Sequence, residues 1–418
     1  MTSADDHDGI ATEAWQTTAI IKFHEKDMYT TSGVLYDDLP GLVGIVSSTH
    51  VRDGRIRSPR TGGRGPGDSR PSRAILKEGD LAVVLVGRTG ESAVVTAEHA
   101  GWTATRSIGI IRAAPHIVSW LRIWLRTPTA QARIEEAVTA HVEPTVSLET
   151  LRRMPFPLPP PHTIAKYHEA FSLIEEMVDL RQAAARQVVE LADAVHGDWS
   201  LAHPAEETRL LSKVATAKTG KGPARSLPRR TKGSATDAVT PRDLFDLTVP
   251  HLESFRLGSS ADAGETWAPG TFMLSTRPDG AYIAVTQHPA SPSRGVVALR
   301  PVDDTDSWWL LHELRSRSGE IAQIAQGRNA REISARAISS RLSVAWPDPI
   351  TRADFHRVAD PLHAMARQLV SESATLCDLK DALLRDISAK AGVLQEQETE
   401  PSERHADSSR PTGHESGW

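Results

Sequence analysis

The sequence of 418 residues holds a single cysteine, Cys377, and no long apolar run. One thiol allows neither a disulfide framework nor a thiolate metal site, which fits a reducing compartment. No apolar stretch approaches the length that spans a membrane, and the first residues, MTSADDHDGIATEAW, lack the basic-then-apolar pattern of a signal peptide. We therefore expect a cytoplasmic protein with no membrane partner.

Catalytic motifs are also missing. The segment 218–222, KTGKG, resembles a phosphate loop but lacks both the Ser or Thr after lysine and a preceding strand. Asp348-Pro349-Ile350 departs from the Asn/Asp-Pro-Pro-aromatic tetrapeptide that an adenine methyltransferase needs. The scattered histidines share no metal-ligand spacing: His141, His162, His168, His196, His288 and His363. We expect no catalytic, cofactor or metal site, and hence a recognition or scaffolding chain rather than an enzyme.

The formal net charge of −5 conceals a strongly basic segment near the N-terminus. Between residues 52 and 73 only Asp53 and Asp68 oppose the arginines, and Gly and Pro are dense enough to favour an exposed loop. The arginines are Arg52, Arg55, Arg57, Arg60, Arg64, Arg70 and Arg73. Two interpretations remain open: a solvated insertion, or a flexible arm that contacts DNA phosphates or base edges.

Two segments carry apolar residues at alternating spacings of three and four. The first runs from Ile164 to Trp199 and is interrupted only by Arg181, which predicts a coiled-coil helix. The second begins at Phe355 and repeats the first series 191 residues later, with Glu372 in the slot of Arg181. Matching seams predict an intramolecular helix pair, whereas two unrelated amphipathic helices are the simpler alternative.

The repeat extends upstream of both seams. Each of four segments in the first half has a counterpart 187 to 191 residues later. The paired segments are 79–85 with 270–274, 108–112 with 295–300, 119–121 with 308–310, and 146–148 with 333–335. Arg88 and Arg277 follow the first pair at equivalent places. The chain is therefore predicted to be an internal duplication.

Three segments carry a resemblance to a known family. The run GDLAVVLVGRTG, the run TVSLETLRRMPFPLPPP and the heptad helix after it resemble the DNA specificity subunit of type I restriction–modification systems. The second half departs from the pattern, with Thr271 in place of Asp80 and 344–347, VAWP, in place of the proline run. A glycine usual before the Thr145 segment is missing in the first half, whereas Gly327 supplies it in the second.

The resemblance implies an α+β fold with two target-recognition-type α/β domains in tandem duplication, separated by two long helices that form an antiparallel coiled coil. Combined with the sequence pattern, it predicts these boundaries: a first domain at 1–158, a spacer helix at 159–200, a basic flexible linker at 201–237, a degenerate second domain at 238–348, a second helix at 349–388 and a disordered tail at 389–418. Local patterns further predict a strand at 42–46, a helix from Ile117 past Gln131, and a helix start at Thr240.

The functional implication is a subunit that reads a bipartite site on double-stranded DNA and docks DNA adenine methyltransferase subunits, with a restriction or translocase subunit as a further partner. S-adenosylmethionine, ATP and Mg²⁺ would then belong to those partners. The expected DNA contacts are the seven arginines of 52–73 together with Arg88 and Arg277. Two alternatives stay open: a DNA-binding accessory protein of another phage-defence or modification system with the same architecture, and a coiled-coil adaptor that does not bind DNA.

The two charges in the seams test the helix pairing directly. Arg181 and Glu372 each lie about halfway along their helices, so they meet if the helices run antiparallel with level ends or parallel in register. The residues allow both arrangements, and the family resemblance selects the antiparallel one. We predict that the two side chains pair across the interface. The alternative is that both extend into water from a loosened seam.

Overall fold

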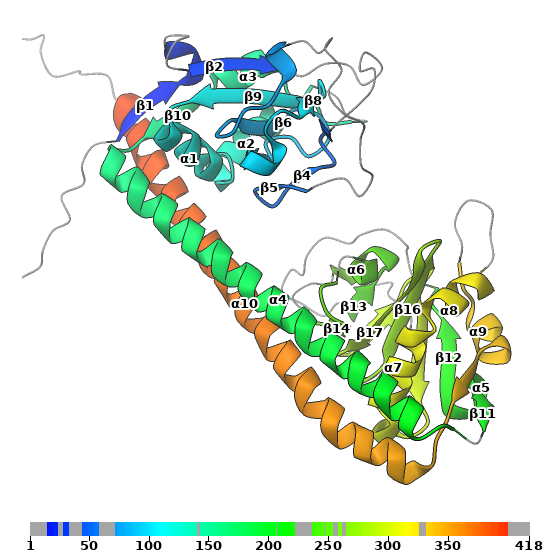
Figure 1. The fold of residues 1–418 in the computed structure, drawn as a ribbon. Helices are drawn as coiled ribbons and strands as arrows, with labels where there is room; N and C mark the ends of the chain where they lie inside the picture. Colours follow the sequence, from blue (N-terminus) through cyan, green and yellow to red (C-terminus); the bar gives the residue numbers. More distant parts are fainter. Residues whose placement is uncertain are drawn as a thin grey trace, which may run out of the picture. The chain divides into compact units, whose positions relative to one another are not determined.

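The computed structural model describes residues 15–23, 28–32, 44–57, 72–139, 143–205, 207–221, 236–245, 247–253, 258–260, 265–325 and 332–399. The chain divides into two compact units. Unit 1 comprises Met1–Glu175 and Cys377–Trp418, and unit 2 comprises Glu176–Leu376. Each unit joins a mixed sheet domain to parts of two long helices, α4 (Pro161–Ala202) and α10 (Pro349–Thr399) (Figure 1). Within the described residues, no helix is both long enough and apolar enough to cross a membrane.

Unit 1 is built on a four-stranded antiparallel sheet in the order β2-β9-β6-β7. Its strands are β2 (Met28–Ser32), β9 (Ile108–Ala113), β6 (Leu81–Val84) and β7 (Ser92–Val94). All four residues of β6 are buried, because the sheet is covered on both faces. Leu81 and Val83 pack with the helices, whereas Ala82 and Val84 pack with residues of the smaller strands.

The helices and smaller strands of unit 1 cover this sheet. The helices are α1 (Pro115–Trp124), α2 (Pro128–Glu136) and α3 (Leu148–Arg153), with 3-10 turns at Ile20–Lys22, Ser72–Ala74 and Ala97–His99. The smaller strands are β1 (Gln16–Ala19) with β10 (Pro155–Leu158), β3 (Ile45–Val46) with β8 (Thr103–Ala104), and β4 (Val51–Arg52) with β5 (Arg55–Ile56). Strand β10 lies in the proline run of the first repeat. Of the strand predicted at 42–46, the described part is β3.

Unit 2 repeats this plan around a five-stranded sheet in the order β12-β19-β16-β17-β14. Its strands are β12 (Ala215–Thr219), β19 (Val297–Pro301), β16 (Phe272–Arg277), β17 (Gly280–Thr286) and β14 (His251–Leu252). A smaller sheet joins β15 (Gly258–Ser260), β13 (Thr236–Val239) and β18 (Ala290–Pro292), and β11 (Thr208–Leu210) pairs with β20 (Ser343–Ala345). The helices are α5 (Leu211–Val214), α6 (Pro241–Phe245), α7 (Ser307–Ser316), α8 (Ser318–Ile324) and α9 (Ala335–Arg341), with a 3-10 turn at Asp304–Asp306.

The predicted duplication is confirmed at the level of topology. Strands β2-β9-β6-β7 correspond in order to β12-β19-β16-β17. The buried indole of Trp120 donates to the Pro157 carbonyl at 2.5 Å, and its counterpart Trp309 donates to the Ala345 carbonyl at 3.0 Å. A serine caps the next helix in each repeat, Ser147 for α3 and Ser334 for α9. Repeated hydrogen bonds of this kind mean that both halves fold by the same local rules.

The predicted flexible linker at 201–237 is wrong over its middle part. Residues 208–219 form β11, α5 and β12, and β11 pairs with β20 just as β1 pairs with β10. This segment therefore begins the second repeat, and the second domain starts near residue 207 rather than at 238. The composition of this segment predicts a linker. Strand β11 is short and fully exposed, so its sequence shows no apolar alternation that would indicate a strand. Residues 222–235 lie outside the described part.

Three further boundaries differ from expectation. The helix predicted from Ile117 past Gln131 is two helices, because the Thr127 side chain caps α2 and Pro128 opens it. Helix α10 continues to Thr399, so the first part of the predicted tail is helical. The remainder, 400–418, lies outside the described residues. The helix start predicted at Thr240 is confirmed, since its backbone N–H donates to Asp243 at 2.7 Å as α6 begins.

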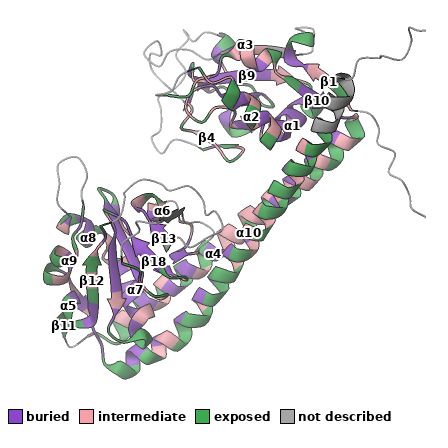
Figure 2. Ribbon diagram, turned by 180° about the vertical axis from the view of Figure 1, so that it is seen from behind, coloured by how far each residue is buried: buried purple, intermediate pink, exposed green. Residues whose placement is uncertain are grey.

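The long helices pair antiparallel, as predicted. Within unit 2, Arg181 of α4 contacts Glu372 of α10, and further along α4 the Trp199 ring contacts Phe355, which lies earlier in α10. The predicted seam of α10 is nevertheless displaced: Val358, Met365 and Leu379 are 40–54% exposed. Phe355 of that seam is buried, but the later buried positions lie one residue after the predicted ones and include His363 and Ser373. Figure 2 shows buried, intermediate and exposed residues alternating along α10. This shift arises because α10 also covers the sheet domain, so its buried face is not the narrow apolar stripe alone.

Candidate nucleic-acid interface

The β4–β5 hairpin presents arginines on a rigid turn in unit 1. Its two turn residues, Asp53 and Gly54, both have positive φ, 54° and 81°, as a two-residue type I′ turn requires. Val51 and Ile56 pair across the hairpin and are buried in the core. Side chains alternate along strands, so Arg52 and Arg55 project away from that core. Arg55 is exposed and Arg52 is partly exposed.

A single carboxylate of the hairpin serves two arginines. Asp53 accepts a hydrogen bond from the Arg57 guanidinium at 3.0 Å, and Arg52 lies 3.8 Å away. The side chains of Arg57 and Asp53 are 62% and 69% exposed, so water competes for both ions. The guanidinium of Arg57 is therefore accessible to an anionic partner.

Two arginines that sequence analysis did not select lie behind this turn. A Cβ placed on Gly54 would lie 3.2 Å from Nη2 of Arg122 and 3.4 Å from Nη1 of Arg126. Arg122 lies in the last turn of α1, and Arg126 follows that helix. The spacing of four residues places both on one side of the helix end, but the sequence holds no signal that the hairpin packs there. We call Arg52, Arg55, Arg57, Arg122 and Arg126 the basic corner.

Glu175 of α4 holds the inner arginines of the basic corner. Arg126 donates to its carboxylate at 2.7 Å, and Arg122 forms a second ion pair with it. Burial alone would raise the pKa of the Glu175 carboxyl, but the charges and hydrogen bonds of Arg122 and Arg126 lower it below its usual value. Glu175 thus fixes both inner arginines of the basic corner.

The other arginines predicted to contact DNA have different surroundings. Arg88 donates to the backbone carbonyls of Ser48 at 3.2 Å and Val51 at 3.0 Å, and pairs with Glu91 at 2.9 Å. This arginine supports the hairpin from behind rather than projecting from it. Arg73 is exposed in the turn Ser72–Ala74. Arg60, Arg64 and Arg70 lie outside the described residues.

Arg277 stands apart because it belongs to unit 2. It ends β16, is exposed, and its guanidinium lies 3.8 Å from the centre of the Phe245 ring. A stacked guanidinium keeps its hydrogen-bonding edge available while its face is fixed. The structure therefore brings Arg52, Arg55 and Arg57 into one cluster and places Arg277 in the other repeat.

The aspartate of the glycine-aspartate motif is structural. Asp80 is 1% exposed and accepts two hydrogen bonds from Arg112, at 2.6 and 2.7 Å, and one from the Lys77 backbone at 2.7 Å. These contacts connect the start of β6 to β9. The motif therefore marks a sheet position rather than a DNA contact.

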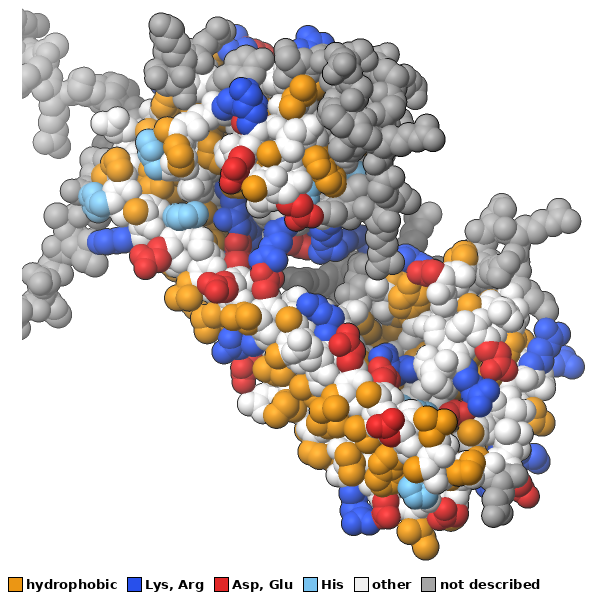
Figure 3. Space-filling view, in the orientation of Figure 1, with side chains coloured by type: hydrophobic (Ala, Val, Ile, Leu, Met, Phe, Trp, Pro, Cys, Tyr) orange, Lys and Arg blue, Asp and Glu red, His pale blue; other side chains and the backbone are white. Residues whose placement is uncertain are grey.

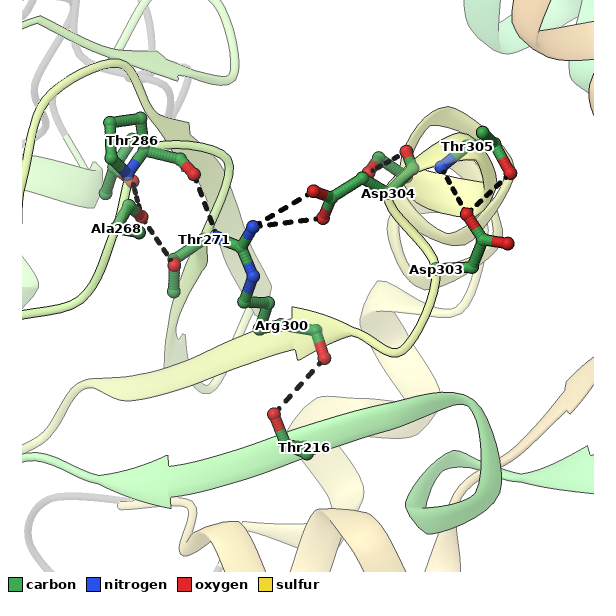
Figure 4. Close-up of polar contacts among 10 residues, drawn as sticks. Thr216, Ala268, Thr271, Thr286, Arg300, Asp303, Asp304 and Thr305 are labelled. Carbon is green, nitrogen blue, oxygen red and sulfur yellow. Dashed lines mark hydrogen bonds and ion pairs between the residues drawn. The ribbon is translucent and has the colours of Figure 1, made fainter.

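The equivalent position of unit 2 is rearranged around Thr271. Its hydroxyl donates to the Ala268 carbonyl at 2.7 Å. Arg300, the counterpart of Arg112, instead pairs with Asp304 at 3.0 Å and donates to the Pro269 carbonyl at 2.9 Å (Figure 4). Arg300 is therefore paired although Thr271 stands at the position of Asp80.

The predicted pair of seam charges is confirmed. Arg181 Nε donates to the Glu372 carboxylate at 2.9 Å, and the two side chains are 29% and 42% exposed. Hydrogen bonds from Arg181 and then Gln368 lower the pKa of the Glu372 carboxyl. The pair is therefore half-exposed rather than buried.

Both long helices also expose large apolar side chains. In unit 2 these include Leu180 at 62%, Leu191 at 52%, Val358 at 40% and Met365 at 54%. In unit 1 Leu173 is 55% and Leu379 is 50% exposed. Figure 3 shows hydrophobic side chains at intervals along the helix surface. Exposed apolar side chains repeated along a helix are typical of surfaces that bind another protein.

Comparison with known proteins finds similar proteins only among solved structures. No protein-family model and no curated protein matches the chain. A structure described as showing complex assembly and conformational transition of the type I R-M system is 18% identical, covers 90% of this chain and 97% of its own, and has a TM-score of 0.43.

Two further structures are S subunits. The type I restriction–modification S subunit from M. genitalium is 13% identical over 91% of this chain and 97% of its own, with a TM-score of 0.44. The HsdS subunit from Thermoanaerobacter tengcongensis is 19% identical over 89% and 96%, with a TM-score of 0.35.

Proposed function

We propose that this chain is the DNA-binding specificity subunit of a type I restriction–modification-like complex. The observation that carries the proposal is the basic corner of unit 1, where arginines project from a two-residue hairpin anchored in the core. A two-stranded ribbon fits the major groove of B-DNA, and arginine is the usual bidentate partner of guanine. In this proposal the duplicated second domain reads the other half of a bipartite site.

The charge arrangement suits an anionic partner, and nucleic acid is the one that we propose. The Arg57 side chain is 62% exposed, and its partner Asp53 is shared with Arg52. A phosphate arriving at the corner can displace this weak, water-exposed pairing, whereas Arg122 and Arg126 stay held by Glu175. The outer arginines would thus contact DNA, and the inner ones would fix the hairpin and add to the positive potential.

Partner chains supply the chemistry in this proposal. The exposed apolar side chains of α4 and α10 dock DNA adenine methyltransferase subunits, and a restriction or translocase subunit joins the assembly. S-adenosylmethionine, ATP and Mg²⁺ belong to those subunits, and the chain itself works without a cofactor. The support from this chain is the set of apolar residues that face outward at heptad spacing, Val358, Met365 and Leu379.

The test is salt-dependent binding of the full chain to labelled duplex DNA, measured by fluorescence anisotropy. Replacing both Arg52 and Arg55 with alanine is expected to weaken binding and to flatten the log–log salt dependence by about 0.9 for each phosphate that is no longer neutralised. An arginine that reads a base would instead relax the preferred sequence at one half-site when replaced, by about 1–3 kcal/mol for a bidentate pair.

The matched control is Arg153→Ala, which removes an exposed arginine of the same unit that pairs with Glu149 on α3. It should leave affinity and salt slope unchanged. Equal effects of the control and the hairpin variant would reject the basic corner as the interface. If the wild-type protein shows no salt-dependent affinity for DNA, the adaptor alternative is supported. If the protein binds DNA but no methyltransferase copurifies with it from its host, a different defence or modification system is supported.

A further inference from the structure

Three buried histidines of unit 2 form a continuous hydrogen-bonded chain. Nε2 of His251 in β14 lies 3.0 Å from Nδ1 of His363 in α10, and Nε2 of His363 lies 2.9 Å from Nε2 of His312 in α7. Nδ1 of His312 lies 2.6 Å from the Asp193 carboxylate on α4. At the far end, the Gln287 amide nitrogen lies 3.2 Å from Nδ1 of His251. The chain thus connects the sheet domain to both long helices.

The carboxylate at one end fixes the direction of every hydrogen bond. Asp193 accepts only, so His312 donates from Nδ1 and accepts at Nε2. His363 must then donate from Nε2 and accept at Nδ1, and His251 must donate from Nε2. The Gln287 amide completes the series as the donor to His251. Because the Gln287 amide donates at one end and the Asp193 carboxylate accepts at the other, each hydrogen bond holds one proton only if every histidine is neutral and in one defined tautomer.

The hydrogen-bonded series of histidines is shielded from water along most of its length. His251, His312 and His363 are each 1% exposed, and the Trp308 ring stacks on His363 with centroids 3.9 Å apart. At the other end, Asp193 and His312 line a cavity of about 540 Å³. Protons from solvent can therefore reach the Asp193 end of the chain through that cavity.

Charged groups of both signs surround the chain. Arg315 of α7 makes two hydrogen bonds to Asp193, at 2.6 and 3.0 Å. Other charged or titratable groups lie on the neighbouring elements. They include Arg186, Glu190 and His196 of α4, Glu313 of α7 with Arg317 after it, Arg367 of α10, and Glu253 beside β14. Arg315 neutralises Asp193, so that carboxylate is not left to stabilise an imidazolium on its own.

The surroundings oppose protonation of each histidine. Burial, followed by nearby cations and the other histidines, lowers the pKa of His251 to about 3 and that of His363 to about 2. Burial also lowers the pKa of His312, although the Asp193 carboxylate partly offsets it. An added proton would place two N–H groups face to face somewhere in the series unless every tautomer beyond it reversed. Acid is therefore expected to break the chain rather than to be absorbed by it.

Unit 1 has no counterpart of this histidine series among the described residues. The repeat offsets of 189 and 191 place Ile123 at the position of His312, Ser172 at that of His363 and Leu384 at that of Asp193. Ile123 and Leu384 are both buried in the apolar core of unit 1. The positions of the histidine series are therefore filled by two apolar residues and a serine in unit 1, so the histidines are not needed for the fold itself.

We propose that the histidine chain His251–His363–His312–Asp193 is an acid-sensitive joint that holds the sheet domain of unit 2 on helices α4 and α10 and opens as the pH falls from 7 towards 5. The joint goes beyond the proposed DNA-binding function and does not depend on it. It would confine the response to acid to one of two otherwise equivalent domains.

Hydrogen–deuterium exchange of the full chain at pH 7 and pH 5 tests the joint. After correction for the intrinsic exchange rate, protection in peptides covering β14, α7 and the part of α10 around His363 is expected to fall about tenfold per pH unit for each histidine protonated on opening. Peptides of β6, β9 and α1 in unit 1 should keep their protection. Equal loss in both units would overturn the proposal.

The first repeat supplies the test variant. Replacing His312 with isoleucine and His363 with serine, the residues of unit 1, should make the unit 2 response to pH shallower. The control His288→Gln changes a half-exposed histidine of the same unit and should leave the response intact. An unchanged response in the double variant would contradict the joint.

The wild-type chain provides a second measurement if the double variant does not fold. Imidazole ¹⁵N shifts at pH 7 should show Nδ1–H for His312 and Nε2–H for His251 and His363. Ordinary titration of these three rings near pH 6.5 in the folded protein would also overturn the proposal.

Discussion

The two repeats share their topology but place their buried ionic groups in different positions. Unit 1 has an ion pair inside its sheet, Asp80 with Arg112. Its domain meets the helices through apolar residues and through the pairs that Arg122 and Arg126 form with Glu175. Unit 2 has Thr271 in the sheet and a polar network between its domain and the helices. Apolar periodicity, turn glycines and helix caps are common to both, so they specify the fold. Buried ion pairs are exchangeable, provided that every member is paired.

The two repeats also differ in their candidate DNA contacts. The basic corner lies wholly in unit 1, whereas Arg277 is the one predicted contact of unit 2 and is stacked on Phe245. In the proposed function, the two domains would therefore read their half-sites with different elements. Such a difference suits an asymmetric site, because two identical readers would select identical half-sites.

The largest expected effect concerns the sheet position. Asp80→Thr copies unit 2 into unit 1 but leaves Arg112 and the Lys77 backbone N–H without their carboxylate. The Asp80 carboxylate is buried but the Arg112 side chain is 31% exposed, so losing these charge-assisted bonds should lower the free energy of unfolding by about 3 kcal/mol. Thr271→Ala in unit 2 should cost only about 1 kcal/mol, because it removes a neutral hydrogen bond. Urea unfolding, followed by hydrogen exchange in peptides of each unit, measures both losses of unfolding free energy. Equal losses in the two variants would refute the difference between the units.

The next effect is a pH dependence from His196, whose counterpart in unit 1 is the buried Ile387. Burial, followed by the charge of His312, lowers the pKa of His196 to about 4. The unfolded chain binds the proton below about pH 6.5, whereas the folded chain binds it only near pH 4. Its stability contribution is thus complete above pH 6.5 and is lost as the pH falls, by about 2 kcal/mol at pH 5.

The variant His196→Ile should remove this part of the acid response. Nε2 of His196 lies 3.8 Å from the Glu313 carboxylate and makes no hydrogen bond, so the substitution sacrifices little at pH 7. Urea midpoints at pH 5 and pH 7 provide the measurement. If the variant loses as much stability on acidification as the wild type, His196 does not contribute to the acid-dependent loss of stability.

A similar contrast holds for the arginines that follow α1 and end α7. Arg126 pairs with Glu175 and its counterpart Arg315 pairs with Asp193, at different places along α4. Glu175→Gln should cost about 1.5–3 kcal/mol, since charge-assisted bonds to two arginines weaken. It should also loosen the β4–β5 turn, which exchange in that hairpin would report. Glu176→Gln, at the neighbouring position, is the control, and an equal effect of the control would contradict the role of Glu175.

Local patterns accounted for much of this fold and long-range contacts for the rest. The seam periodicity and the matched Trp120 and Trp309 revealed the duplication, because both signals recur at a fixed offset. Strand β11 was missed because its three residues are all exposed and become a strand only by pairing with β20.

The candidate site was predicted less completely. Sequence selected the hairpin arginines by local charge density, but Arg122 and Arg126 join them only through packing against Gly54. The displaced face of α10 had the same origin, since polar His363 and Ser373 are buried by contacts that apolar periodicity does not encode. The histidine chain draws its members from separate elements, so no spacing in the sequence could announce it.

The smallest effect concerns Arg181 and Glu372, the one place where equivalent slots of the two repeats meet. They occupy the same seam position, 191 residues apart, and an antiparallel pairing of duplicated helices brings the central slots face to face. An identical residue in both slots would set like charges against each other, so opposite charges favour this register over a shifted one. Because both side chains are partly exposed, the stabilisation is modest and salt should screen it.

Charge reversal tests this register. Arg181→Glu should destabilise the helix pair slightly at low salt, and adding Glu372→Arg should restore most of the stability. The matched control combines Arg181→Glu with Glu190→Arg, which restores the net charge on α4 without restoring the ion pair. Thermal unfolding at low salt and in 1 M salt compares the variants, and the differences should shrink as the Debye length falls to about 3 Å. If the swapped double variant is no more stable than the control double variant, the opposite charges at this slot do not set the register of the two helices.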